Sequence, residues 1–388
     1  INAMTPGSSP EQKRASADKV KIAFIGIGNR GAQIIGDFER TQQIDVVALC
    51  DVDLDGRQCQ EVLAKFPKAK RFRDFRKMFD EAGNEFEAVA IATPDHSHFP
   101  ISMLALAEGK HVFVEKPLAR TFYEAELLMN AAKKRPNQVT QVGNQGHSEA
   151  NYFQFKAWTE AGIIKDVTAI TAHMNNARRW HGWDANIIKF PAGQQLPKDM
   201  DWDTWLGVNP YHDYNKDYHQ GQWRCWYDFG MGALGDWGAH ILDTAHEFLE
   251  LGLPYEVSML YANGHNDYFF PYSSTILFRF PQRKGMPPVD VTWYDGLDNL
   301  PPIPEGYGVQ GLDPNIPTTN QTNQPQAKLN PGKIIYSKDL TFKGGSHGST
   351  LEIIPKEKAI EMADKLPEVP KSPSNHYENF IRACKGLE

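Results

Sequence analysis

The chain has 388 residues, a formal net charge of -7 and a pI near 6.0. This acidic balance argues against a nucleic-acid partner, because nucleic-acid binders carry basic faces. No apolar run approaches the roughly 20 residues that a transmembrane helix needs, so no membrane partner is expected. Hydrophobic residues at 41% and charged residues at 23% are typical of a globular protein. The length of the chain allows two domains.

The first residues and the cysteines carry little information about function. Residues 1–18 are polar and aperiodic, which predicts a disordered lead-in, and the opening "INAM" resembles a vector-derived scar. No secretory signal is visible, so two locations stay open: export, if a signal peptide has been removed, or the cytoplasm. The four cysteines are scattered and predict neither a disulfide framework nor a metal site.

The first ordered segment, "VKIAFIGIGNRG", predicts a nucleotide-binding turn. A continuous apolar run over residues 20–25 is typical of a strand covered on both faces, and "AQIIGDFERT" follows it with apolar residues at helical spacing. Between them, Gly26, Gly28 and Gly31 match G-x-G-x-x-G, where glycines permit a tight turn, approach to a pyrophosphate and close helix packing. Asn29 and Arg30 lie in the same turn and join the predicted cofactor contacts.

The next strand, "DVVALCD", ends in Asp51. A carboxylate at this place accepts hydrogen bonds from the ribose diol and repels a 2′-phosphate, so NAD is favoured over NADP. The alternative is an aspartate that only opens a loop or caps a helix.

Strands and helices keep alternating beyond this point. Strands are predicted at 88–92, 110–118 and 138–147, with helices ending near Gly109 and covering 123–134. Repeated β-α-β units predict a doubly wound parallel sheet over about residues 20–145, whose ligands bind at the carboxyl ends of its strands. Thr93, Lys116 and Asn144 fall at such ends.

Five motifs in order, "GIGNRG", "CD", "TPDHSH", "EKP" and "GALGDWGAHILD", resemble those of the Gfo/Idh/MocA family of oxidoreductases. The resemblance covers roughly residues 20–260 and is nearest to bacterial members with "GNQGHS" and a tryptophan-rich second domain. It implies a Rossmann domain followed by an α/β domain with a large, mainly antiparallel sheet. Family members usually continue for tens of residues beyond "NHYENFIRACKG", whereas this sequence stops at Glu388, so either the sequence is truncated or a terminal segment is missing.

The resemblance also assigns roles in the first domain. Lys116 would border the nicotinamide and touch the reacting hydroxyl, the peptide before Pro117 is often cis in the family, and Glu115 would support this loop. Three "TPDHSH" residues match positions at the nicotinamide end of the pocket: Thr93, Pro94 and His98. Gln145 is expected beside the cofactor, and His147 beside the substrate, where the chain enters the second domain.

Asp236 and His240 match the D-x-x-x-H pattern of the family. On a helix predicted over 235–251, Asp236, His240 and Asp243 share one face, so Asp236 could orient His240 as a proton acceptor. The catalytic residues are therefore predicted as Lys116, His240 and Asp236. Because no carboxylate-rich partner segment accompanies Asp243 and His246, no metal is predicted.

All nine tryptophans lie between Trp158 and Trp293. Indole faces stack on sugars while Arg, His and Asp bind hydroxyls, so the clusters "RRWHGW" and "QWRCWYDFG" predict a carbohydrate pocket. Its candidate contacts are Arg179, His181, Arg224 and Tyr227. The alternative is that the aromatic residues fill the core or an oligomer interface.

The remaining segments organise the second domain. Its predicted range is 146–388, after a cofactor domain at 19–145, with a Pro- and Asn-rich excursion at 297–332 that could wrap a neighbouring subunit. We expect a homodimer or homotetramer. "FKGGSHGSTLEIIP" lacks G-K-[ST] and predicts a hairpin turn, and the last helix is expected to start at Ser372 or Ser374.

The leading hypothesis is an NAD-dependent oxidoreductase that acts on a sugar, cyclitol or glycoside. The first alternative is a redox-neutral glycosidase that oxidises, eliminates and re-reduces its substrate, as the NAD-dependent N-acetylgalactosaminidases that resemble this family do. The second alternative is a sugar or nucleotide binder without activity.

Overall fold

The computed structural model describes residues 18–174, 184–219, 221–297, 299–308 and 330–387. Its internal contacts divide the chain into two compact units. Unit 1 is formed by Ile1–Gly143, Pro191–Gly230 and Ser374–Glu388, and unit 2 by Asn144–Phe190 and Met231–Pro373. No helix among the described residues is long and apolar enough to cross a membrane.

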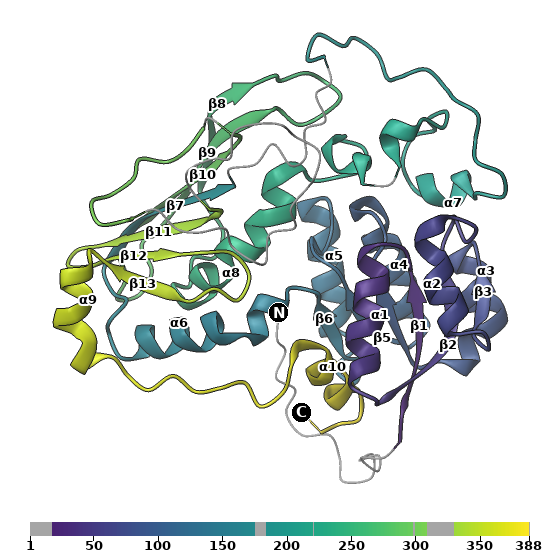
Figure 1. The fold of residues 1–388 in the computed structure, drawn as a ribbon, viewed down its shortest axis with the longest axis horizontal. Coiled ribbons are helices and arrows are strands. Elements are labelled where there is room, and N and C mark those ends of the chain that lie inside the picture. Colours follow the sequence, from purple (N-terminus) through teal and green to yellow (C-terminus); the bar gives the residue numbers. More distant parts are fainter. Residues whose placement is uncertain (1–17, 175–183, 220, 298, 309–329, 388) are drawn as a thin grey trace. The chain divides into compact units, whose positions relative to one another are not determined.

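Unit 1 contains a six-stranded parallel sheet in the order β3-β2-β1-β4-β5-β6 (Figure 1). Its strands are β1 (Val20–Ile25), β2 (Ile44–Cys50), β3 (Lys70–Phe72), β4 (Ala88–Ile91), β5 (His111–Val114) and β6 (Thr140–Val142). Its helices are α1 (Arg30–Arg40), α2 (Arg57–Lys65), α3 (Phe75–Ala82), α4 (Asp95–Ala107), α5 (Phe122–Lys133), α7 (Trp202–Leu206) and α10 (His376–Cys384). The doubly wound sheet predicted from the sequence is confirmed.

The alternation of side chains along β1 explains why helices cover both faces of this sheet. Val20, Ile22 and Phe24 enter a core that α1, α2 and α10 complete. Ala23 and Ile25 point to the opposite face and enter a core completed by α3, α4 and α5. A strand buried on both faces needs an unbroken apolar sequence, which "VKIAFI" supplies apart from one exposed lysine.

Between Asp51 and Ala88 the structure contains α2, β3 and α3, which were not predicted from the sequence. The sequence pattern for β3 is weak because this strand, Lys70–Phe72, has only three residues, lies at the sheet edge and exposes two of its residues. The signal for α3 is local, since the Asp74 side chain caps the helix by accepting from the Arg76 N–H.

Two segments beyond residue 143 pack within unit 1, so its extent differs from the predicted 19–145. The buried His96 ring lies within hydrogen-bonding distance of the Trp205 and Phe229 carbonyls and joins residues 191–230 to α4. Helix α10 places Tyr377 and Phe380 against Phe38 of α1.

The start of the last helix differs from the prediction by one position. Asn375, rather than Ser372 or Ser374, is the N-cap of α10. Its side chain accepts from the N–H groups of Tyr377 and Glu378 and satisfies two donors of the first turn.

Unit 2 contains a seven-stranded sheet in the order β13-β12-β11-β7-β10-β9-β8. Only β7 and β10 pair in parallel, so the predicted large and mainly antiparallel sheet is confirmed. The strands are β7 (Val167–Met174), β8 (Glu256–Asn263), β9 (Ser273–Phe280), β10 (Val289–Asp295), β11 (Gly332–Ser337), β12 (Thr341–Gly344) and β13 (Leu351–Ile354).

The helices of unit 2 bury an apolar face of this sheet. They are α6 (Ala150–Glu160), α8 (Ala239–Phe248) and α9 (Lys356–Met362). Phe155 of α6 and Ala245 of α8 share a core with Ile170, Val291 and Ile335 of the central strands. Strands β12 and β13 pair antiparallel, so "GGSHGST" is a hairpin connection as predicted.

Candidate functional site

The glycine turn after β1 has the geometry that a dinucleotide requires. Gly26 has φ +79°, and a Cβ there would lie 2.8 Å from the backbone of Ala92 and Thr93. A Cβ on Gly31 would collide with the Gly26 carbonyl oxygen, so only glycine lets α1 begin so close to the turn. These residues fit a bound pyrophosphate at the N-terminus of α1.

Asn29 and Arg30 lie between Gly28 and Gly31. Asn29 precedes α1 with φ 44°. The Arg30 guanidinium donates to Glu115 Oε1 at 2.8 Å and to the Tyr377 hydroxyl at 3.2 Å. Burial opposes its charge, but Glu115 and Tyr377 outweigh burial and raise the pKa of Arg30. Arg30 therefore ties α1 to the end of β5, which also accounts for the support expected from Glu115.

Asp51 lies at the carboxyl end of β2, where its carboxylate is fixed by two backbone donors. Oδ2 accepts from the Ile27 N–H at 2.9 Å, and Oδ1 accepts from the Asp53 N–H at 3.0 Å. The first bond couples Asp51 directly to the glycine turn. A carboxylate fixed in this way is pre-oriented for a ribose diol.

His98 connects the "TPDHSH" and "EKP" loops of unit 1. Its Nδ1 lies 2.7 Å from the Pro117 carbonyl oxygen, and its Nε2 lies 2.9 Å from the Thr93 carbonyl oxygen. The Lys116–Pro117 peptide is cis, as the resemblance implied. Lys116 therefore follows β5 on a loop that is fastened to the neighbouring strand end.

Two buried oxygens, one in each unit, test whether the residues present fit a cofactor. Thr93 Oγ1 and Gln145 Oε1, both predicted cofactor contacts, are buried and make no hydrogen bond within the part of the chain that the structure describes. Buried polar atoms are nearly always paired, so such atoms indicate a missing ligand or water. Pro94 is the N-cap residue of α4, so Thr93 comes directly before the start of that helix in the chain.

Segment 191–230 holds two of the predicted substrate contacts. Arg224 lies over the Trp223 ring at 4.2 Å, and its guanidinium is 3.8 Å from Asp95 in the first turn of α4. The Tyr227 carbonyl accepts from Arg120. Burial lowers the pKa of the nearby His96 to about 4, so this ring is neutral in its anchoring role.

In unit 2, His240 is 7% exposed and its partner fixes its tautomer. The Asn144 amide donates through Nδ2 to the Ala239 carbonyl at 3.0 Å, so Oδ1 is the atom that faces His240 Nδ1, also at 3.0 Å. An oxygen accepts only, so Nδ1 of His240 carries the proton and Nε2 carries the lone pair of the neutral ring. This is the tautomer of a general base that acts through Nε2.

Asn144 was placed at a strand end from the sequence, but its bond to His240 was not predicted. Its amide oxygen lies at Nδ1 of His240, the ring that Asp236 was predicted to orient. Asp236 is 3% exposed and lies in a π-helical turn, Leu234–Gly238, where a regular α-helix was expected. Such turns frequently occur at functional sites.

A charged network surrounds His147. Its Nδ1 lies 2.8 Å from Asp243 Oδ2, and its Nε2 lies 3.3 Å from Glu247 Oε2. Lys333 of β11 is 2% exposed near Asp243; burial, opposed by Asp243, lowers its pKa to about 8. Both nitrogens of His147 thus face protein carboxylates.

The structure brings one residue to His240 that the sequence did not indicate. His347, in the connection between β12 and β13, stacks on His240 with ring centroids 4.1 Å apart and planes at 23°. The connection was correctly predicted as a turn, but nothing in its composition pointed to this contact.

Some predictions lie outside the site or outside the described residues. Arg179 and His181 belong to residues 175–183, which the structure does not describe. Among the described residues, no group of three or more metal-ligating side chains is placed to hold an ion. The seven described tryptophans are each at most 7% exposed, so they fill cores: Trp158, Trp202, Trp205, Trp223, Trp226, Trp237 and Trp293.

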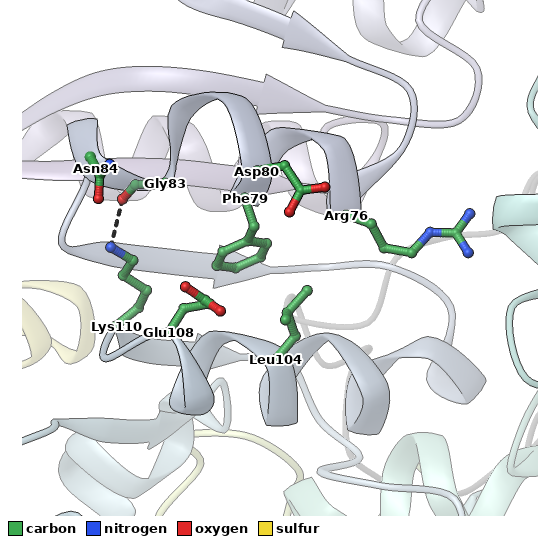
Figure 2. Close-up of a pocket in the computed structure, with 8 residues that line it drawn as sticks. All are labelled: Arg76, Phe79, Asp80, Gly83, Asn84, Leu104, Glu108 and Lys110. Carbon is green, nitrogen blue, oxygen red and sulfur yellow. Dashed lines mark hydrogen bonds between the residues drawn. The ribbon is translucent and has the colours of Figure 1, made fainter.

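A groove of about 410 Å³ on unit 1 lies apart from these residues (Figure 2). It is formed between α3 and the end of α4, and the Lys110 ammonium on its wall donates to the Gly83 and Phe86 carbonyls. None of the residues predicted to bind cofactor or substrate lines it.

Three comparisons place these features among known proteins. Residues 20–143 match the model of the Gfo/Idh/MocA oxidoreductase family, NAD-binding Rossmann fold, and residues 159–274 match the C-terminal α/β domain of the same family. Inositol 2-dehydrogenase of Salmonella typhimurium is 28% identical over 160 residues, which cover 41% of this chain and 46% of that protein. A glycosyl hydrolase family 109 protein of Shewanella pealeana is 28% identical over 132 residues, 33% of this chain and 29% of that protein.

The curated relatives are thus matched over about half of their length or less. Among solved structures, the WlbA dehydrogenase of Chromobacterium violaceum, in complex with NADH and UDP-GlcNAcA, has a TM-score of 0.60 at 16% identity and covers 96% of this chain and 88% of its own. Levoglucosan dehydrogenase, in complex with NADH and L-sorbose, has a TM-score of 0.56 at 16% identity; the match covers 95% of this chain and 88% of that protein. These likenesses show a shared fold. The two family models together match more than half of the chain, which therefore belongs to the Gfo/Idh/MocA family of oxidoreductases.

Proposed function

We propose that the protein is an NAD-dependent oxidoreductase that transfers hydride between nicotinamide and a hydroxyl-bearing carbon of a sugar, cyclitol or glycoside. The observation that carries this proposal is the fixed tautomer of His240, because oxidation of an alcohol needs a base for the hydroxyl proton. The relatives named for inositol oxidation and the neighbours solved with sugar ligands support the substrate class.

The dinucleotide would be held by the turn from Gly26 to Gly31 and by Asp51, with Thr93 and Gln145 as further contacts. It would supply the acceptor for the hydride. Asp51 favours NAD, since its carboxylate would repel the 2′-phosphate of NADP.

The proposed reaction assigns a separate chemical role to each of the residues predicted to be catalytic. Lys116 places a positive charge at the end of β5, which would stabilise a developing alkoxide. His240 takes the hydroxyl proton at Nε2, while Asn144 keeps the other proton on Nδ1. Asp236 is proposed as a residue that helps to orient His240, and Arg224 as a sugar contact.

A redox-neutral glycosidase is the second candidate, and the similarity to glycosyl hydrolase family 109 proteins favours it. Such an enzyme would oxidise its glycoside, expel the aglycone and return the hydride to the product. It needs the same base and the same lysine, so the site alone does not separate the two candidates.

Absorbance near 340 nm, followed with concentrated enzyme, excess NAD and pooled sugars and glycosides, separates them. A rise far beyond one equivalent of enzyme supports the dehydrogenase, and a burst capped at one equivalent with release of aglycone supports the glycosidase. Lys116→Ala and His240→Ala should abolish either signal, whereas His246→Ala, an exposed position on the same helix as His240, should not. Full activity in both of the first two variants would show that Lys116 and His240 are not catalytic. Absence of either signal from the unsubstituted protein with every substrate would leave a binding protein.

A further inference from the structure

We propose that His347 is a positioning residue that acts through His240 by fixing the plane of its ring. The inference rests on the proposed function, since it assigns His347 a role in presenting the base. The hairpin connection that carries His347 is separated from α8 by about a hundred residues of sequence, yet it ends against the ring of His240.

The rings form a closed aromatic group. His347 lies nearly parallel to His240, and the Trp237 ring meets His347 edge-on at 5.2 Å and 85°. Trp237 also meets His240 edge-on, at 6.0 Å and 68°. A ring covered on one face and bounded at its side cannot rotate without displacing its neighbours.

Asn144 and His347 restrict different motions of His240. The Asn144 bond at Nδ1 selects the tautomer but still permits the ring to tilt about that bond. The stacked imidazole covers the ring face and restricts the tilt. Together they would aim Nε2 in one direction, which general-base catalysis requires.

The backbone of the connection shows that His347 is held in place. Its φ is +51°, a left-handed conformation that costs a non-glycine residue free energy, although histidine adopts it more often than most residues. Gly146 accommodates it, because a Cβ at Gly146 would lie 3.0 Å from the His347 carbonyl oxygen. Ser346 is fully buried, with Oγ 3.0 Å from His347 Nδ1.

A connection that served only to reverse the chain would need neither the strain nor the ring. Glycine or asparagine at position 347 would make the same turn with less strain. The imidazole therefore has a function beyond the turn, and its contact with the proposed base identifies that function.

The test compares two substitutions of His347 in the full-length protein loaded with NAD. His347→Asn removes the ring but tolerates the positive φ, so the variant should fold. We expect kcat to fall by ~10- to 100-fold with KM changed less than twofold, because orientation rather than binding is lost. His347→Phe keeps a flat ring and should recover kcat to within about threefold of the original. His246→Phe is the matched control and should leave kcat unchanged.

A readout without turnover separates this inference from the proposed function. The His240 ring resonances should keep the Nδ1–H tautomer in His347→Asn but lose the ring-current shift of the stacked imidazole. If His240→Ala leaves activity intact, the proposed role of His240 as the base fails, while the resonances still report whether the stack exists. Equal kcat loss in His347→Asn and His347→Phe, or unchanged His240 resonances in His347→Asn, would overturn the positioning role.

Discussion

The two units organise their proposed functional residues in different ways. In unit 1 the candidate site is made mainly of backbone: a glycine turn, strand ends and a cis peptide. Each of these features lies within one short sequence motif. In unit 2 the candidate site is made of side chains from three distant segments, represented by Asn144, His240 and His347. Backbone geometry leaves a strong mark on sequence because only glycine or proline meets it, whereas contacts between distant side chains leave almost none.

The largest effect is expected in unit 2, at the amide that selects the tautomer. Asn144→Leu removes the acceptor at His240 Nδ1 and permits the tautomer whose Nε2 carries a proton, so kcat should fall by ~10³-fold. Steady-state kinetics with a saturating substrate would measure this loss. Asn144→Asp retains an acceptor oxygen and should lose less activity; if both variants lost the same amount, the tautomer argument would be wrong.

The next effect concerns unit 1, where a single methyl group should disrupt the turn. In Gly31→Ala the new Cβ meets the Gly26 carbonyl, so we expect the free energy of unfolding to fall by about 3 kcal/mol and NAD affinity to be lost. Gly36→Ala, in the same helix, has only the Arg40 guanidinium near its Cβ, at 3.8 Å. This control should stabilise the protein by about 0.5–1 kcal/mol. Urea unfolding and calorimetric titration with NAD would measure both variants.

Unit 2 also contains a buried charge whose effect depends on pH. The pKa of Lys333 is about 8 in the folded chain, below the ordinary 10.5, so the unfolded chain binds more protons between those values. The free energy of unfolding should therefore rise with pH through this window, by at most about 3 kcal/mol from this residue.

Lys333→Met should remove that pH-dependent rise and stabilise the protein below pH 8, by about 1–3 kcal/mol. Lys338→Met, at an exposed position after the same strand, is the control and should change neither quantity. Urea unfolding at several pH values would test this. A slope that survives in Lys333→Met would mean that another group titrates there.

The smallest effect is expected at Asp51. Asp51→Ala should weaken the binding of NAD. It should also reduce the ratio of NAD affinity to NADP affinity by ~10-fold, because the repulsion of a 2′-phosphate is removed. The same change removes the acceptor for the Ile27 N–H in the glycine turn that both dinucleotides would use. The affinity for NADP should therefore rise by less than the affinity for NAD falls. Dissociation constants for both dinucleotides would measure the preference; an unchanged ratio would show that Asp51 only braces the turn.

Most of unit 1 could be predicted because each strand that is buried on both faces has an apolar sequence and is followed by a residue that ends it, such as Gly26 or Pro117. The exception, β3, lies at the sheet edge and has no apolar run. In unit 2, His240 was found through its motif, but Asn144 and His347 were not connected to it. Their contacts arise from the packing of η3 (Gln145–Ser148), α8 and the β12–β13 hairpin, which no local pattern encodes.

The return of α10 to unit 1 has a consequence for how the chain is made. Phe38 and Phe113 lie in a core that is complete only when Tyr377 and Phe380 pack against them. During synthesis the first sheet is translated early, but one of its apolar faces stays partly uncovered until α10 has left the ribosome. Unit 2 has all of its strands before that point. We therefore expect the part that is translated first to be the last to reach its final stability.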